Sequence, residues 1–257
     1  MLYAMSDIHG CLEEFDKNLE YIDFDSGDRL ILLGDYIDYG SKSGQVLYRI
    51  SELLETYGKE RIILLKGNHE QMLLDWIKEY MKPIREEMEI LYFDSWLKND
   101  ASTGYNTFKT LVSEEHFKNI KEAEKSASFV SLNVKAVKFV MSDSRDLIRM
   151  INGMKLFYET DDQIFVHAGV NEDARENWKW ATSQDTFLGK YPAVKGSFYK
   201  TIISGHVGTA TVSGNPDYHD MYYDGKSHYY IDGSVYKGGK IVLLSYDEKD
   251  ASYRQVN

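Results

Sequence analysis

Side chains that can bind metal ions or transfer protons stand at the ends of apolar runs along this sequence. In chain order they are Asp7, His9, Asp35, Asp38, Asn68, His69, His167 and His206. Carboxylates mixed with imidazoles suit divalent metals such as manganese, iron or zinc. Eight side chains are too many for one cation, whereas two cations about 4 Å apart can share a carboxylate. The set therefore predicts a centre with two metal ions.

Each of these motifs taken alone has a plainer interpretation. An aspartate such as Asp7 can cap a helix, Gly-Asp pairs are common in turns, and Glu70 is favourable near the positive end of a helix. His167 and His206 taken singly would be core histidines with satisfied hydrogen bonds. The placement of all eight side chains at strand ends favours the metal centre over these interpretations.

The elements that must position these side chains alternate between strand and helix. The apolar runs that predict the first three strands are 2–6, 29–33 and 61–65. Apolar residues at helical spacing from Val46 to Tyr57, with Ser43 as N-cap and Gly58 as C-cap, predict a helix between the second and third strands. Near-continuous apolar strands indicate a parallel sheet. Ligands collect at the carboxyl ends of such strands. Three pairs of polar residues fall there: Asp7 and His9, Asp35 and Asp38, and Asn68 and His69.

The remainder of the chain falls into two parts. From about 75 to 150 the sequence is charged and mostly helical, which predicts a helical insertion after the third strand. After Gly153, short runs of β-branched and aromatic residues predict a second sheet, with a hairpin turn at Asp161 and Asp162. We expect one domain, residues 1–257, because no Ser/Gly/Pro-rich linker interrupts the sequence.

The composition of the chain limits the kinds of binding partner and the cellular compartment that we expect. The chain has 257 residues and a net charge of −11, from 30 Lys and Arg against 41 Asp and Glu. Such a surface disfavours nucleic acid, whose binding depends on basic side chains that neutralise phosphates. No run of about 20 apolar residues predicts a membrane span. The single cysteine, Cys11, excludes an internal disulfide, and the N-terminus reads as a strand, so we expect a cytoplasmic protein.

Five motifs together resemble a known family. "SDIHG", "GDYIDYG", "GNHE", "VHAGV" and "SGHVG", between residues 6 and 208, resemble the ordered motifs of the calcineurin-like metallophosphoesterases. More narrowly they resemble the phosphoprotein phosphatase branch, which includes bacterial Ser/Thr phosphatases and symmetrical diadenosine tetraphosphatases. The tail "YYIDGSVYKGGKIVLLSY" resembles the closing strands of that family. The resemblance implies an α/β fold: a four-layer αββα sandwich of two mixed sheets, with a helical insertion.

The resemblance also implies a role for each matching side chain. The implied metal ligands are Asp7 and His9 on the first metal, Asp35 on both, and Asn68, His167 and His206 on the second. His69 would be the general acid, and Asp38 would orient it by a hydrogen bond. A general acid of this kind suits phosphoester hydrolysis, since the leaving alkoxide needs a proton and imidazole titrates near neutral pH.

The predicted function is metal-dependent phosphoester hydrolysis by a hydroxide bound at a dinuclear centre, without a covalent enzyme intermediate. The expected metal is manganese, with iron or zinc as alternatives. We place a Ser/Thr phosphatase-like phosphomonoesterase first. The alternatives are a dinucleoside polyphosphate hydrolase and a low-activity regulatory module that binds metal and phosphate. The expected partner is a phosphorylated substrate: a phosphoprotein, a nucleotide or a small phosphate ester.

Tyr39 departs from the pattern of the family, which usually has a phosphate-binding arginine after the second aspartate. Lys190 is a candidate point-charge substitute, although lysine lacks the fork of donors that arginine offers. Three explanations stay open. The metals, Asn68 and Lys190 would hold the phosphate; or Tyr39 would contact an aromatic or nucleobase group of a different substrate; or the chain would bind phosphate with little catalysis.

Overall fold

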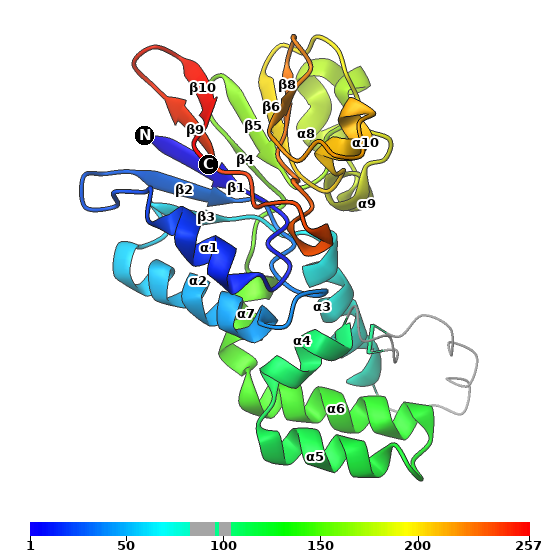
Figure 1. The fold of residues 1–257 in the computed structure, drawn as a ribbon. Coiled ribbons are helices and arrows are strands. Elements are labelled where there is room, and N and C mark those ends of the chain that lie inside the picture. Colours follow the sequence, from blue (N-terminus) through cyan, green and yellow to red (C-terminus); the bar gives the residue numbers. More distant parts are fainter. Residues whose placement is uncertain (83–95, 98–103) are drawn as a thin grey trace.

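Three parallel strands form the centre of the first sheet in the computed structural model, which describes residues 1–82, 96–97 and 104–257 (Figure 1). They are β1 (Leu2–Met5), β2 (Arg29–Leu32) and β3 (Ile62–Leu64). The register pairs Leu2 with Arg29 and Leu30 with Ile62. The three strands predicted from the apolar runs, and their parallel arrangement, are thus confirmed.

The second sheet contains five strands from the second half of the chain. In the order in which they pair, they are β4 (Phe157–Glu159), β5 (Gln163–Val166), β6 (Thr201–Ser204), β8 (His228–Tyr230) and β7 (Tyr222–Tyr223). Strands β5, β6 and β8 are parallel, whereas β4 and β7 run antiparallel at the two edges. The predicted turn at Asp161 and Asp162 joins β4 to β5 as an antiparallel hairpin.

The last two strands correct the expectation that everything after Gly153 would belong to the second sheet. Strand β9 (Leu244–Asp247) pairs antiparallel with β1, and β10 (Ser252–Gln255) pairs with β9. Both therefore extend the first sheet, which becomes mixed. This pairing covers the edge of β1, whose backbone amides and carbonyls would otherwise lack partners.

Alternating side chains along the strands sort the molecule into four layers. In β1, Tyr3 and Met5 pack with helices, whereas Leu2 and Ala4 pack toward the second sheet. In β5, Phe165 lies between the sheets, whereas Ile164 and Val166 pack on the other face with Trp178 and Phe187. Full burial of one such side chain contributes about 1.5–3 kcal/mol. The predicted αββα sandwich of two mixed sheets is confirmed.

Helices cover the outer face of each sheet (Figure 1). Those on the side of the first sheet include α1 (Leu12–Leu19), α2 (Ser43–Tyr57) and α3 (Asn68–Tyr80). Those on the side of the second sheet are short: α8 (Trp178–Ala181), α9 (Gln184–Gly189) and α10 (Thr209–Ser213). In the described part of the chain, 3-10 helices span Glu172–Asn177, with a kink at Arg175, and Val235–Lys237.

The caps predicted for α2 are half right. Gly58 is the C-cap, with φ of 76°. Ser43, the predicted N-cap, is instead the first residue of the helix, after Lys42. Its hydroxyl accepts a hydrogen bond from the backbone amide of Asp38, so the loop after β2 engages the side chain that was expected to cap the helix.

Among the described residues, four helices lie between β3 and β4 after α3, where a helical insertion is predicted. They are α4 (Gly104–Leu111), α5 (Glu114–Ala123), α6 (Phe129–Asp143) and α7 (Arg145–Asn152). In Figure 1, α4, α5 and α6 extend away from the two sheets. The parts of this prediction at 83–95 and 98–103 lie outside the described residues. Within the described residues, every helix is too short or too polar to cross a bilayer.

Candidate metal centre

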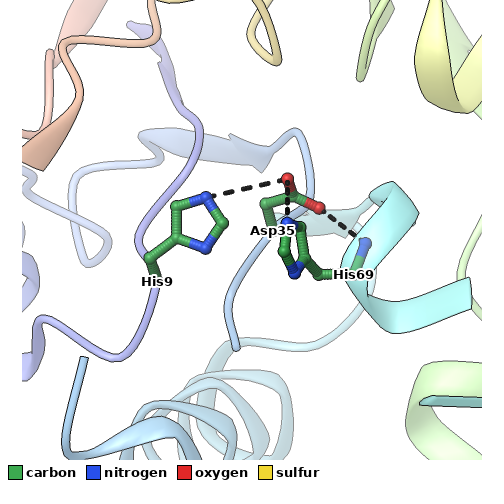
Figure 2. A group of neighbouring side chains, drawn as sticks. All are labelled: His9, Asp35 and His69. Carbon is green, nitrogen blue, oxygen red and sulfur yellow. Dashed lines mark hydrogen bonds and ion pairs between the residues drawn. The ribbon is translucent and has the colours of Figure 1, made fainter. Parts of the chain in front are cut away.

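The carboxylate of Asp35 lies between two groups of side chains that can bind metal. The first group is His9, Asp35 and His69, and the second is Asp35, His167 and His206; within each group the ligand atoms lie within 4.8 Å of one another. The Oδ2 atom of Asp35 is 3.7 Å from His9 Nε2 and 3.4 Å from His167 Nε2. Figure 2 shows His9 and His69 converging on this carboxylate. One carboxylate is therefore shared by two groups.

Asn68 and Asp7 complete the set of six predicted ligands. The Oδ1 atom of Asn68 lies 2.9 Å from His167 Nε2 and 3.0 Å from His206 Nδ1. Asp7 Oδ1 lies 3.9 Å from His9 Nε2, and its Oδ2 accepts a hydrogen bond from the His206 amide at 3.0 Å. The structure thus brings together side chains that lie as far apart as residues 7 and 206 of the sequence.

Backbone carbonyls orient two of the imidazoles. His9 Nδ1 is 2.8 Å from the carbonyl oxygen of Ile37, and His167 Nδ1 is 3.0 Å from that of Leu33. A carbonyl can only accept, so both Nδ1 atoms carry the proton in the neutral imidazole. In the neutral rings each Nε2 then carries the lone pair and faces Asp35. A hydrogen bond from the other ring nitrogen to a carbonyl is common in metal-binding histidines.

These contacts test whether the residues fit a metal. His167 Nε2, Asn68 Oδ1 and Asp35 Oδ2 are all acceptors when the imidazole is neutral, and they face one another at 2.9 and 3.4 Å. His9 Nε2 faces the carboxylates of Asp7 and Asp35 in the same way. Buried acceptors that converge without a donor are unfavourable. A proton on His167 Nε2 or a cation between the acceptors resolves the conflict. The residues therefore fit divalent cations with mixed nitrogen and oxygen ligands.

Burial and the neighbouring carboxylates set the protonation of the imidazoles. For His167 burial lowers the pKa, but Asp35 outweighs it and raises the pKa to about 9. Desolvation lowers the pKa of His9 and that of His206 to about 4, so both are neutral near pH 7 and can offer a lone pair. Burial raises the pKa of Asp7 well above its usual value, and the nearby carboxylate of Asp232 adds to this effect. For Asp35 burial acts in the same direction, but the imidazoles of His167 and His69 prevail and lower its pKa.

His69 makes a second type of contact at the edge of the first group. Its Nδ1 atom lies 2.7 Å from Asp38 Oδ2, and its Nε2 atom lies 3.9 Å from Asp35 Oδ2. Burial lowers the pKa of His69, but Asp35 and Asp38 outweigh it and raise the pKa to about 9. A protonated imidazole beside the carboxylate of Asp35 can supply a proton to a group bound there.

Left-handed backbone conformations gather around the centre. The site residues with positive φ are Asp7 (53°), His9 (45°), Asp35 (57°), Asp38 (72°), Tyr39 (61°) and His206 (63°). Such conformations cost a non-glycine residue about 1–3 kcal/mol and persist only where the surroundings hold them. Here the His9 amide donates to the Asp35 carbonyl at 2.9 Å, and Gly10 donates to Tyr36 at 2.8 Å. The two loops therefore hold each other in place.

Glu70 ties the third motif to the second, a role that the sequence analysis missed. Its buried carboxylate accepts hydrogen bonds from the backbone amides of Asp35 and Tyr36, each at 2.8 Å, and of Gly67, at 2.9 Å. The last contact satisfies an amide at the start of α3, where a glutamate was expected to be favourable. Burial raises the pKa of Glu70 to about 7, and the charge of Asp35 contributes.

Tyr39 lies in an aromatic cluster beside the first group. Its ring stacks on that of Tyr236, with centroids 4.2 Å apart and planes 8° apart. The centroid of the His9 ring lies 4.9 Å from the centroid of each tyrosine ring, and its plane stands at 77° and 74° to theirs, so both contacts are T-shaped. Neither phenol hydroxyl has a hydrogen-bond partner among the described residues. The sequence analysis did not single out Tyr236, which lies in the tail that resembles the closing strands of the family, because nothing in that stretch relates its ring to Tyr39.

Lys190 makes its contacts elsewhere. Its ammonium donates to the carbonyl oxygen of Val170 at 2.5 Å and forms an ion pair with Glu172. Its alkyl chain packs against Gly169, two residues after His167. Among the described residues, no hydrogen bond or ion pair joins Lys190 to the six predicted ligands. Its role in substrate binding stays a prediction.

Comparison with known proteins agrees with the five motifs. A family model described as calcineurin-like phosphoesterase matches residues 2–219. Two proteins named symmetrical bis(5'-nucleosyl)-tetraphosphatase are similar in sequence. That of Wigglesworthia glossinidia brevipalpis is 39% identical over 87 residues, which is 33% of this chain and 29% of that protein. That of Nitrosococcus oceani is 42% identical over 74 residues, 28% of this chain and 25% of that protein. The match thus spans between a quarter and a third of each relative.

Solved structures share the fold along almost the whole chain. The crystal structure of a putative diadenosine tetraphosphatase superposes with a TM-score of 0.56 at 14% identity, covering 99% of this chain and 92% of that one. A cold-active protein tyrosine phosphatase of a psychrophilic Shewanella species superposes with a TM-score of 0.51 at 14% identity, covering 100% and 80%.

Proposed function

The chain belongs to the calcineurin-like phosphoesterase family, and we propose that it is a metal-dependent phosphoester hydrolase with two cations at the described centre. The observation that carries the proposal is the position of Asp35, whose one carboxylate is shared by two groups of ligands. A single structural cation would have no use for a second group. Two adjacent cations are a common solution for phosphoester hydrolysis.

Six residues would hold the cations. In this proposal Asp7 and His9 bind the first, Asp35 binds both, and Asn68, His167 and His206 bind the second. When bound, the cations supply an activated water molecule at neutral pH and neutralise charge on the phosphoryl oxygens. Manganese is the proposed metal, and the mixed nitrogen and oxygen ligands also suit iron or zinc.

His69 is the proposed general acid. It donates the Nε2 proton to the leaving oxygen, while its Nδ1 proton stays on the hydrogen bond to Asp38. That hydrogen bond fixes the ring and stabilises the imidazolium, as the third member of a catalytic triad does. Figure 2 shows the His69 ring beside the Asp35 carboxylate, which both cations would share in this proposal.

Dinucleoside polyphosphates are the proposed substrate class. The sequence analysis put phosphoproteins first, but the named sequence relatives are tetraphosphatases that act on bis(5'-nucleosyl) compounds, which favours the alternative. The stacked rings of Tyr39 and Tyr236 beside His9 support this substrate, because aromatic side chains stack on bases. We also propose that the protein works in the cytoplasm, since its one cysteine forms no internal disulfide.

A substrate panel tests the proposal. The chain is loaded with Mn²⁺ and assayed with diadenosine tetraphosphate, a phosphoserine peptide and p-nitrophenyl phosphate. Preferred hydrolysis of the dinucleotide supports the substrate class, and preferred hydrolysis of the peptide supports a Ser/Thr phosphatase instead. Binding without turnover on all three, across a metal and pH series, contradicts the hydrolase and favours a regulatory module that binds metal and phosphate.

A further inference from the structure

We propose that Thr107 and Trp96, both from the segment between β3 and β4, are positioning residues for the proton donor His69. The inference rests on the function proposed above. Both residues act through Asp38, whose side chain is fully buried and makes the 2.7 Å contact with His69. The helical insertion would thereby form part of the catalytic apparatus, rather than an addition beside it.

Donors from the insertion hold both oxygens of the Asp38 carboxylate. The Thr107 hydroxyl donates to Oδ1 at 2.6 Å, and the Trp96 indole Nε1 donates to Oδ2 at 3.0 Å. Oδ2 is also the atom that faces His69 Nδ1. A carboxylate that accepts at both oxygens cannot rotate about its terminal bond without breaking at least one of these contacts. Its orientation toward His69 is therefore fixed from the side of the insertion.

The same threonine also holds the backbone of Asp38. The Asp38 amide donates to Thr107 Oγ1 at 2.9 Å and to Ser43 Oγ at 3.1 Å. Asp38 has φ of 72°, a conformation that needs support in a non-glycine residue. One hydroxyl thus accepts from the amide and donates to the carboxylate of the same strained residue.

Packing in turn fixes the insertion against the sheet side of the molecule. On α4, the backbone of Thr110 packs so closely on α2 that a Cβ atom at Gly44 would overlap the Thr110 carbonyl, a contact that does not depend on the Thr110 side chain. Gly104 at the start of α4 packs so closely on Trp96 that a Cβ atom would overlap the indole ring. Rigid support of this kind is what a precise catalytic geometry requires.

Three variants of α4 isolate the hydrogen bonds between Thr107 and Asp38. Thr107→Val keeps the shape of the side chain but removes the hydroxyl, and Thr107→Ser keeps the hydroxyl. Thr110→Val is the matched control, because it makes the same change one turn later on the same helix. It removes the hydrogen bond donated by the Gly44 amide at 2.8 Å and the one donated to the Thr107 carbonyl, but no hydrogen bond to Asp38. A loss of general helix stability would appear in both valine variants, whereas a loss of positioning would appear only at Thr107.

The first readout needs neither metal nor turnover. In the metal-free protein, the His69 Nδ1 proton is followed by NMR and assigned by its absence in His69→Asn. We expect this resonance to shift or to broaden through exchange in Thr107→Val, and to keep its wild-type position in Thr107→Ser and Thr110→Val. An unchanged resonance in Thr107→Val would overturn the proposal, whether or not the protein proves to be a hydrolase.

The second readout is the dependence of kcat on the leaving group. A general acid matters most for poor leaving groups, so phenyl phosphate and an alkyl phosphate are compared with p-nitrophenyl phosphate in the Mn²⁺-loaded protein. We expect Thr107→Val to lower kcat about 10–100-fold for the poor leaving groups, the usual effect of an outer-shell change, with KM retained. The loss for p-nitrophenyl phosphate should be smaller, and Thr107→Ser should restore the rates.

The outcomes separate the two proposals. Equal losses on all three esters would mean a structural role for Thr107 and would overturn the positioning role. A wild-type protein that hydrolyses none of its tested esters would refute the proposed function, while the His69 resonance would still report whether Thr107 positions the imidazole.

Discussion

The imidazole of His69 and the carboxylate of Asp38 face each other at 2.7 Å, between Nδ1 and Oδ2. Asp38 is fully buried and lies on the loop after β2, whereas His69 is the second residue of α3. The contact leaves the opposite nitrogen, Nε2, facing the Asp35 carboxylate at 3.9 Å. An imidazole held on one side and exposed to the metal centre on the other has the geometry of a proton donor.

His69→Asn tests that role. We expect the variant to retain two cations, since His69 is not among the six proposed ligands, and to lose about 10²–10⁴-fold in kcat on esters with poor leaving groups. Metal content by mass spectrometry and steady-state kinetics check the two parts separately. A fully loaded variant with wild-type turnover would remove His69 from the mechanism, and loss of one cation would make it a ligand, as its place in the first group also permits.

Gly205→Ala tests how closely the loop after β6 approaches Asp7. A Cβ atom at Gly205 would overlap Asp7 Oδ2 and Ser6 Oγ, so the carboxylate has to move. We expect the affinity for Mn²⁺, measured by calorimetry, to fall about 10-fold or more. The control is Gly189→Ala, where the added carbon meets no atom within 4 Å. Equal affinities in the two variants would contradict the packing argument.

Tyr236→Ala tests the aromatic pair. Removing the ring that stacks on Tyr39 should weaken binding of diadenosine tetraphosphate by about 1–3 kcal/mol, the usual contribution of base stacking. The readout is KM for the dinucleotide against KM for phosphoserine, which should not change. Tyr223→Ala removes a comparable stacked tyrosine, whose ring lies 4.4 Å from that of Tyr229, and serves as control. A parallel rise in both KM values would argue against nucleobase recognition.

Asp224 provides a test in the pH dependence of stability. Burial opposes ionisation of its carboxyl group, but amide hydrogen bonds from Gly196 and His228 prevail and lower its pKa to about 2. An unfolded aspartate titrates near 3.9, so the difference corresponds to about 2–3 kcal/mol of folding free energy. Because the folded pKa is the lower one, this contribution is complete above about pH 4 and is lost as the pH falls toward about 2.

Denaturant unfolding of the wild type and of Asp224→Asn checks the direction of this pH dependence. The stability difference between them should be largest near neutral pH and should shrink as the pH falls through that window. Asp217→Asn, at an exposed position, is the control and should track the wild type throughout. A difference that stays constant with pH would show that the carboxylate charge of Asp224 is not what stabilises the loop.

The sequence predicted those parts of the structure that follow from periodicity and from the order of the motifs. The parallel strands and the sandwich of two sheets were correct, and side chains from five loops meet as expected. Apolar strands must bury both faces, and parallel strands bring their carboxyl ends to one edge, so these features follow from local patterns.

Contacts between distant segments were not predictable in the same way. The roles of Thr107, Trp96, Glu70 and Tyr236 arise only when other loops approach them, although Glu70 and Tyr236 lie in stretches that resemble the family. The left-handed backbone at the site falls on aspartate, histidine and tyrosine rather than on glycine, so composition gave no sign of it. The pairing of β9 with β1 depends on which sheet edge remains open, a property of the whole fold.

The central claim is that Asp35 is shared by two cations. Crystals grown with excess Mn²⁺ and measured near the manganese absorption edge test it directly, through the anomalous difference map. The account predicts two peaks, one on each side of the Asp35 carboxylate, the first beside His9 and the second beside His167 and His206. A single peak, or peaks away from Asp35, would contradict it.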